Sequence, residues 1–257
     1  MKIFAILFLH LCTCVGYAFS LSISKQDANQ IAERIWKNEC AGSIEGLTHW
    51  KKGENFPSLG IGHFIWYAPN KKERFQETFP ELLGFLQESG STLPAWLEET
   101  EGCPWTSRED FYAHIKSSKM ESLRQMLYDT KDLQAIFIAK RLEKSLPKMI
   151  ENLPQEEKTK VTYAFNRLSE SPRGLFALMD YVNFKGEGTS SAETYNGQGW
   201  GLLQVLQGIP SDSNSTEIVD SFMKSAKDTL EQRVKNSPPE RNEKQWLKGW
   251  LNRVDNY

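Results

Sequence analysis

LTHWKKGENFPSLGIGHFIWY, residues 47–67, is the stretch of sequence that decides the fold. Gly53, Gly60 and Gly62 punctuate its first part, and an aromatic and β-branched run over residues 63–67 follows them. Such a run, bounded by turn residues, is typical of a strand. We therefore expect a β-hairpin region near residues 55–67.

Upstream of this stretch we expect a helix that begins at Ser24 and carries a candidate acid near its end. Residues 28–36 place apolar side chains at the spacing of a core-facing stripe, and Glu39 would project from the same face. A buried carboxylate is costly unless it is paired or used, and desolvation would raise the pKa of Glu39 toward that of a general acid. The alternative is an acid at a helix end that reaches solvent or pairs with Lys37 or Arg34.

Downstream, helical patterns dominate, and the predicted fold class is α+β, predominantly α-helical. The expected helices cover residues 71–88 with a break at Phe79-Pro80, a helix capped by Ser107, residues 133–142, 155–168, 172–182, 202–206 and 216–234, and a last helix after Pro238-Pro239. The last helix carries Trp246 and Trp250, which we expect to be core anchors.

Residues 31–67 resemble the phage-type lysozymes. The matching positions are Glu39 for the catalytic acid, Leu47 and Trp50 for a leucine and an aromatic residue, Ser58 for the active-site threonine, and Gly60, Gly62 and His63 for the end of the family's β motif. The resemblance implies a lysozyme-like fold over residues 21–257, with a small α+β lobe at about 24–100 and a helical lobe at about 101–257. It also implies that Glu39 is the general acid of a glycosidase, and it places Trp50 and His63 near the substrate.

The sequence departs from this family at the second catalytic carboxylate, where it has Lys52. Two alternatives remain open for an enzyme. Glu54 could activate water with help from Ser58, or Glu39 could act alone, which would be similar to the lytic transglycosylases. A third alternative is a non-catalytic envelope protein that keeps the scaffold and binds glycan or protein.

A second group of candidate residues lies in the glycine-rich segment 183–204. Glu187, Tyr195, Trp200 and Gln204 are of the types that bind saccharides, because aromatic faces stack on sugars and polar side chains bind hydroxyl groups. Gly-Leu-Leu-Gln at 201–204 is also similar to a helix start of the lytic transglycosylases. We expect these four residues to bind substrate, with Glu187 as a further candidate for the second carboxylate. The alternative is a glycine-rich helix start with a buried tryptophan.

Residues 1–20 are predicted to be a signal peptide. Lys2 precedes an apolar run that ends in Ala18-Phe19-Ser20, a pattern suited to cleavage after Ser20; an uncleaved anchor is the alternative. We therefore expect a protein exported to the periplasm or secreted, with no stable membrane insertion after cleavage. Cleavage would leave Cys40 and Cys103, either as a disulfide or as two buried free thiols.

Charge and motifs exclude several other classes of function. The formal net charge is −2, without the basic footprint of a nucleic-acid-binding protein, and no metal or cofactor motif is visible. The expected partner is a polysaccharide with β-1,4-linked amino sugars, of which peptidoglycan is the leading candidate. No feature of the sequence indicates an oligomeric state.

Overall fold

The computed structural model describes residues 23–71, 75–211 and 217–257. The predicted signal peptide lies outside this range. The described part is predominantly helical with two small antiparallel sheets, which confirms the predicted fold class. Its α-helices are α1 (Lys25–Cys40), α2 (Phe79–Glu88), α3 (Ala95–Glu98), α4 (Arg108–Ala113), α5 (Ser118–Asp129), α6 (Lys131–Ile150), α7 (Gln155–Ser169), α8 (Pro172–Lys185), α9 (Leu202–Gly208), α10 (Ile218–Asn236) and α11 (Lys244–Val254), and its 3₁₀ helices are η1 (Glu45–Leu47) and η2 (Pro239–Arg241).

The predicted β region is a three-stranded sheet of very short strands. β1 (Thr48–His49), β2 (Ser58–Leu59) and β3 (Phe64–Ile65) pair antiparallel in that order. The prediction of a strand over residues 63–67 was too long, because His63 has a left-handed backbone (φ 49°) and belongs to the preceding turn. A second sheet pairs β4 (Thr194–Tyr195) with β5 (Gln198–Gly199).

Local capping explains where several helices begin. The hydroxyl groups of Ser24 and Ser107 accept hydrogen bonds from backbone N–H groups at the starts of α1 and α4. The predicted break at Phe79-Pro80 is instead the start of α2, and residues 75–78 before it are not helical. Proline fits the first helical turn because no intrahelical partner is lost there.

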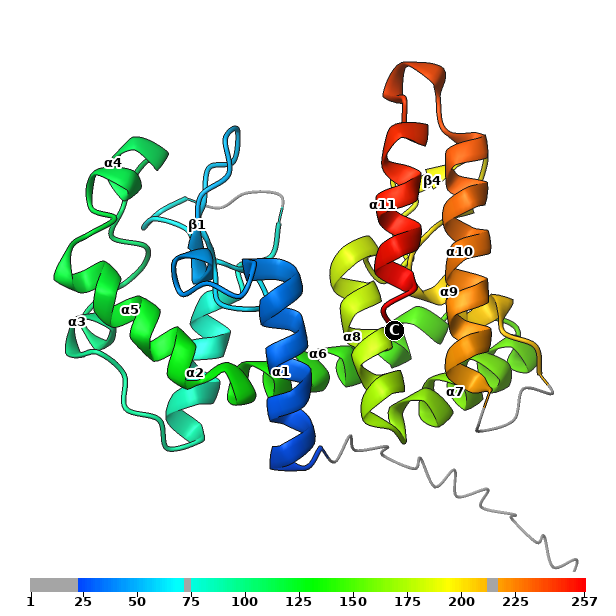
Figure 1. Cartoon of the computed structure of the whole chain (residues 1–257), viewed down its shortest axis with the longest axis horizontal. Helices are drawn as coiled ribbons and strands as arrows, with labels where there is room; N and C mark the ends of the chain where they lie inside the picture. Colours follow the sequence, from blue (N-terminus) through cyan, green and yellow to red (C-terminus); the bar gives the residue numbers. More distant parts are fainter. Residues whose placement is uncertain (1–22, 72–74, 212–216) are drawn as a thin grey trace, which may run out of the picture.

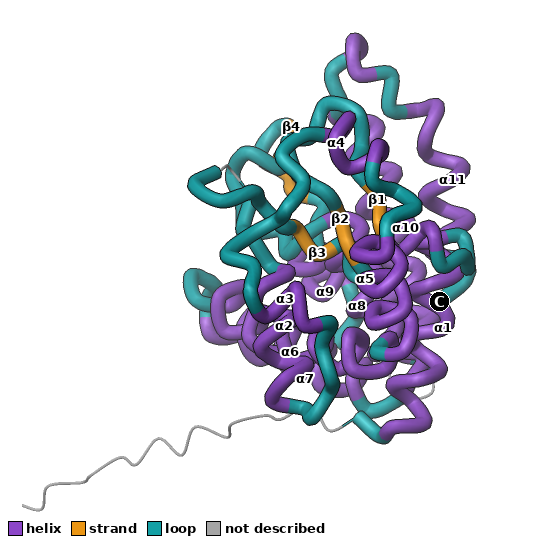
Figure 2. The backbone as a smooth tube through the Cα atoms, turned by 90° about the vertical axis from the view of Figure 1, so that its left-hand side faces the viewer, coloured by secondary structure: helices purple, strands orange, loops and turns teal. Residues whose placement is uncertain are grey.

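Helix α6 runs between two groups of elements (Figure 1). One group holds the three-stranded sheet with α2 to α5, and the other holds α7 to α11, while α1 packs against both α6 and α8. Figure 2 shows the strands of the first sheet lying together beside α4 and above the purple helices. Residues 101–130, which the sequence placed in the helical lobe, contact the sheet: Arg124 donates a hydrogen bond to the hydroxyl of Thr48 (2.8 Å).

A continuous hydrophobic core joins these elements. It includes Trp66, Phe79, Phe165 and Phe222, all of them essentially inaccessible to solvent. The expectation of two core tryptophans in α11 holds only in part, since Trp250 is half-buried against the core but Trp246 is 56% exposed. Among the described helices, none has an apolar stretch long enough to cross a bilayer.

Candidate functional site

The turn between β2 and β3 places His63 beside the end of α1. Gly60 has a left-handed backbone (φ 67°), and a Cβ atom there would lie 2.4 Å from Oε1 of Gln134. Gln134 is completely buried and accepts a hydrogen bond from the backbone N–H of Ile61 (2.9 Å). At Gly62 a Cβ atom would meet the ring of Phe64 at 2.5 Å. Both glycines are therefore required by close packing of the turn on α6 and β3.

Glu39 lies in the last turn of α1 and contacts that histidine. Its Oε2 atom is 3.5 Å from Nδ1 of His63, and the Glu39 side chain is only 13% exposed. Its other oxygen, Oε1, accepts a hydrogen bond from Nη2 of Arg253 on α11. The structure thus brings together two of the predicted site residues, Glu39 and His63. The carboxylate is ion-paired with Arg253, not with either predicted partner, Lys37 or Arg34.

Arg253 also forms an ion pair with a second carboxylate, that of Asp180. Its Nε and Nη2 atoms donate to Oδ2 and Oδ1 of Asp180 on α8, at 2.7 and 2.9 Å. The hydroxyl of Tyr257 donates to Oδ2 of Asp180 (2.7 Å), and the Arg253 guanidinium lies 4.5 Å from the ring centre of Phe184. The Asp180 side chain is 1% exposed, so three hydrogen bonds compensate the desolvation of this charge.

The pKa values of the two groups that donate to Asp180 reflect this arrangement. Burial alone would lower the pKa of Arg253, but hydrogen bonds and charge attraction from Asp180, together with the charge of Glu39, raise it above its usual range. Burial raises the pKa of Tyr257 well above its ordinary value, and the Asp180 charge raises it further. Arg253 is therefore charged and Tyr257 is protonated at any physiological pH.

A cavity of about 190 Å³ is lined by residues that adjoin members of this cluster in the sequence. Its walls include Gly62 from the turn and Asn183, Gly186 and Glu187 from the end of α8. Gly62 precedes His63 in the chain, and Asn183 precedes Phe184, whose ring packs on Arg253. The cavity therefore lies between the β2–β3 turn, α6 and α8, and Glu39 and His63 are not among its lining residues.

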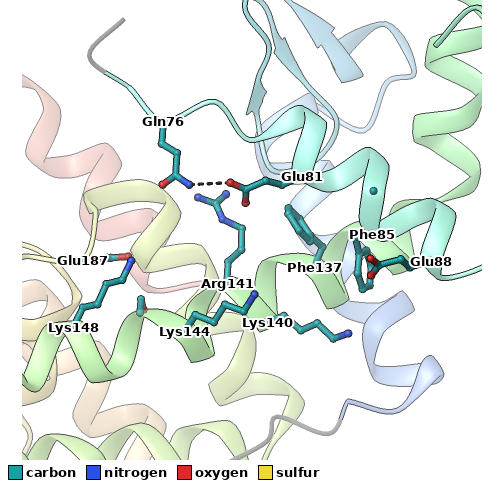
Figure 3. Close-up of a pocket in the computed structure, with 12 residues that line it drawn as sticks. Gln76, Glu81, Phe85, Glu88, Phe137, Lys140, Arg141, Lys144, Lys148 and Glu187 are labelled. Atoms are coloured by element: carbon teal, nitrogen blue, oxygen red, sulfur yellow. Dashed lines mark hydrogen bonds between the residues drawn. The ribbon is translucent and has the colours of Figure 1, made fainter. Parts of the chain in front are cut away.

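A groove of about 510 Å³ between α2 and α6 shares Arg141, Ser145 and Glu187 with this cavity. Figure 3 shows Arg141 extending from α6 toward Gln76 and Glu81, while Glu187 enters at the far end beside Lys148. The rings of Phe85 and Phe137, 5.5 Å apart, provide an apolar wall. Together the two spaces form a mixed polar and aromatic groove of the size that small ligands occupy.

The other predicted catalytic residues lie on the sheet side of the molecule. Ser58 is half-buried in β2, opposite His49 and Ile65. The backbone carbonyl of Glu54 accepts a hydrogen bond from the indole of Trp50 (2.8 Å), and Lys52 is exposed. Within the described residues, no hydrogen bond or ion pair joins Ser58 or Glu54 to Glu39.

Several predicted substrate-binding residues have structural partners. The ring of Trp50 is 2% exposed and packs edge-on against Phe111. Trp200 is 7% exposed, with the Arg233 guanidinium 4.0 Å from its ring centre. Both tryptophans therefore pack in the interior of the protein.

Tyr195 and Gln204 hold the glycine-rich segment together. The hydroxyl of Tyr195 donates to Glu243 (2.9 Å). The amide of Gln204 accepts from the backbone N–H of Gly201 and donates to the carbonyl of Gly188. Of the four predicted residues in segment 183–204, Glu187 is the one that lines the cavity and the groove.

The two cysteines of the described chain are free thiols in separate surroundings, so the disulfide alternative is not observed. Cys40 lies at the end of α1, with its Sγ atom 3.9 Å from the carbonyl of Gly60. Cys103 donates to the carbonyl of Trp105 (3.4 Å). Burial raises the pKa of both thiols to about 12, which makes them poor nucleophiles.

Sequence reasoning missed Arg253, Asp180 and Tyr257. Asp180 follows Met179 in an otherwise apolar helix and could have been noticed as a buried acid that needs a partner. Arg253 gave no comparable signal, because a basic residue near the end of a helix is common.

The described residues contain no group of three or more His, Cys, Asp or Glu side chains that could hold a metal ion. No family model, curated protein or solved structure matches this chain. The function must therefore be argued from the geometry of the Glu39 cluster and the adjoining cavity.

Proposed function

We propose that the protein is an exported glycosidase of lysozyme-like fold that cleaves a β-1,4-linked amino-sugar polymer, most plausibly peptidoglycan. The observation that carries this proposal is the Glu39–His63 contact (3.5 Å), because the adjacent residue Gly62 lines a cavity together with Glu187. A largely buried carboxylate that contacts the turn bordering a cavity suits general acid catalysis on a saccharide.

The arrangement of elements supports the same proposal. Glu39 ends the first described helix, a small sheet with a glycine-rich turn follows it, and α6 runs between the two groups of elements. A helix that ends in Glu39 and is followed by a small sheet is the order that the resemblance to the phage-type lysozymes implies. The groove between α2 and α6 would hold the polymer, and Glu39 would donate a proton to the leaving glycosidic oxygen.

The proposal assigns the second carboxylate to Glu187 ahead of Glu54. Glu187 lines the cavity together with Gly62, whereas Glu54 lines neither this cavity nor the groove between α2 and α6. A carboxylate across the cavity from the acid could activate water. If Glu187 is dispensable, Glu39 acts alone, and the product would be that of a lytic transglycosylase.

Digestion of purified peptidoglycan by wild-type protein and by Glu39→Gln tests this proposal. We expect Glu39→Gln to lose at least about a hundredfold in rate, since removal of a general acid has effects of this order. Glu151→Gln is the matched control, because Glu151 is an exposed acid just beyond α6. Mass spectrometry of the products separates the two enzymes: reducing ends indicate hydrolysis, and 1,6-anhydro ends indicate transglycosylation.

The Glu39–Arg253 ion pair favours one other function, that of a non-catalytic glycan-binding envelope protein. In this alternative the carboxylate serves to hold α11 against α1. Wild-type protein that binds peptidoglycan in a pull-down assay but releases no fragments would favour this alternative over the enzyme. Equal rates for wild type and Glu39→Gln would exclude Glu39 as the acid.

A further inference from the structure

The hydrogen bonds of Arg253 are divided between two carboxylates in a way that fixes its orientation. Nε and one hydrogen of Nη2 point to the two oxygens of Asp180, which is a bidentate pairing. The second hydrogen of Nη2 is then directed at Oε1 of Glu39. Because a guanidinium is planar, fixing two of its donors on Asp180 also fixes the direction of the third.

Asp180 itself is held firmly in place. It is part of α8 and is 2% exposed, and the Tyr257 hydroxyl occupies a further lone pair at 2.7 Å. The backbone carbonyl of Tyr257 in turn accepts a hydrogen bond from Nε of Arg173 (2.8 Å), also on α8. The carboxylate of Asp180 is therefore a rigid reference point on which Arg253 is oriented.

We propose that Asp180 is a positioning residue for Glu39: it orients the Arg253 guanidinium, which sets the direction and charge environment of the Glu39 carboxylate. Asp180 acts only through Arg253. This inference rests on the proposed function for its kinetic consequence, but the geometric coupling between Asp180 and Glu39 can be measured without any activity.

The charged groups that surround the two carboxylates determine what the loss of Asp180 would change. Glu39 is faced by His63 from the turn and by Arg253 from α11. Asp180 is faced by Arg253 and Tyr257, and it also interacts electrostatically with Arg34 of α1. In Asp180→Asn, Glu39 would be the remaining ion-pair partner of Arg253, and the guanidinium would lose the bidentate contact that orients it.

The kinetic test compares wild type with Asp180→Asn on soluble peptidoglycan fragments between pH 4 and pH 9. We expect kcat to fall roughly tenfold or more with little change in KM, because misplacement of a reacting group affects the transition state most. Asp220→Asn is the matched control, since Asp220 is an exposed partner of Arg173 with a side chain 66% exposed.

The test that needs no activity is a double-mutant cycle on thermal unfolding. Glu39→Gln is made in wild type and in Asp180→Asn, and the loss in Tm is compared. We expect a larger loss in the Asp180→Asn background, because Glu39 is then the remaining counter-ion of Arg253. If wild type proves inactive, the proposed function fails, while the cycle still decides whether Asp180 and Glu39 are coupled.

Arg253→Lys keeps the test decisive if Asp180→Asn does not fold. Lysine retains the positive charge but cannot form the bidentate pairing with Asp180. We therefore expect the same loss of kcat as in Asp180→Asn. Equal effects of Asp180→Asn and Asp220→Asn on kcat would overturn the proposal, as would full activity of Arg253→Lys. Tm losses that are the same in both backgrounds of the cycle would overturn it as well.

Discussion

At the scale of single residues, the site depends on backbone conformations that few side chains adopt. Ala41, which ends α1, and His63 both have left-handed backbones, with φ of 51° and 49°. Ala41 lies two positions after Glu39, and His63 is itself part of the Glu39–His63 contact. Strain of this kind persists only where the surroundings enforce it, and here the turn is fixed by Gly60 and Gln134.

Gly60→Ala is expected to lower the free energy of unfolding by roughly 3 kcal/mol. About 1–2 kcal/mol comes from the left-handed backbone, and the rest comes from the Cβ atom that would displace the buried amide of Gln134. Denaturant unfolding followed by circular dichroism measures the change.

Gly53→Ala is the control for this prediction. Gly53 also has a positive φ (89°), but a Cβ atom there would meet nothing within 4 Å. We expect a loss of only about 1–2 kcal/mol from the backbone conformation. Equal losses in the two variants would show that the contact with Gln134 does not restrain the turn.

The sequence pointed to Glu39 and His63 but not to their partners, for a physical reason. A helix with an apolar stripe and a glycine-rich turn are local patterns, and they are visible within about thirty residues. The contact of Glu39 with Arg253 joins positions 214 residues apart, and no local pattern specifies it. The alternative of an ion-paired Glu39 named Lys37 and Arg34, but the partner in the structure is Arg253.

At the scale of elements, α8 and α11 pack through alternating aromatic rings and cations. Lys185 at the end of α8 lies 3.4 Å from the ring centre of Trp250 and 4.0 Å from that of Phe184. Burial, followed by the nearby charge of Arg233, lowers its pKa from 10.5 to about 7. Within the described residues this lysine has no carboxylate within ion-pair distance, so its charge weakens the contact between the two helices.

Lys185→Met is expected to raise the free energy of unfolding near pH 7.5 by on the order of 2 kcal/mol. Between pH 7 and pH 10.5 the unfolded chain binds the proton that the folded protein releases, so the stability of wild type rises with pH across this window. The advantage of the variant should therefore shrink by roughly 1 kcal/mol per pH unit.

Chemical unfolding of both proteins at pH 7.5 and pH 9.5 checks this dependence. Lys248→Met is the control, because Lys248 is an exposed residue of the same helix α11. A stability difference between wild type and Lys185→Met that stays constant with pH would contradict the assigned pKa of Lys185.

Most elements could be predicted because the interactions that start them join residues close together in the sequence. Ser24 and Ser107 cap helices as expected. Pro80 was misread as a helix breaker, because the same residue either ends a helix or opens one, depending on the chain before it. Trp246 was misread as a core residue because periodicity identifies a face of α11 but not how much of that face is covered.

At the scale of the whole molecule, one core holds both groups of elements without a covalent link between the described cysteines. Cys40 and Cys103 are each at most 3% exposed, and each donates to a different backbone carbonyl. The sequence could not decide between a disulfide and free thiols, since both are compatible with buried positions.

The thiols should be unreactive in the folded protein. In a chain that begins at Leu21, we expect almost no reaction with Ellman's reagent under native conditions, because burial raises both pKa values to about 12. Two thiols per chain should react in denaturant. Fewer than two in denaturant without a reducing agent would indicate an oxidised pair and contradict the structure.

The distance along the chain between Glu39 and Arg253 has a consequence for the order of folding. Contacts between residues 214 positions apart close a long loop, and the entropy of closing it is lost before the contact contributes. Helices α1 and α6 can pack early, since much of their contact is apolar, whereas the Glu39 carboxylate acquires its partner only when α11 has docked on α8. During refolding, the activity that the proposed function assigns to Glu39 should therefore recover later than the helical circular dichroism.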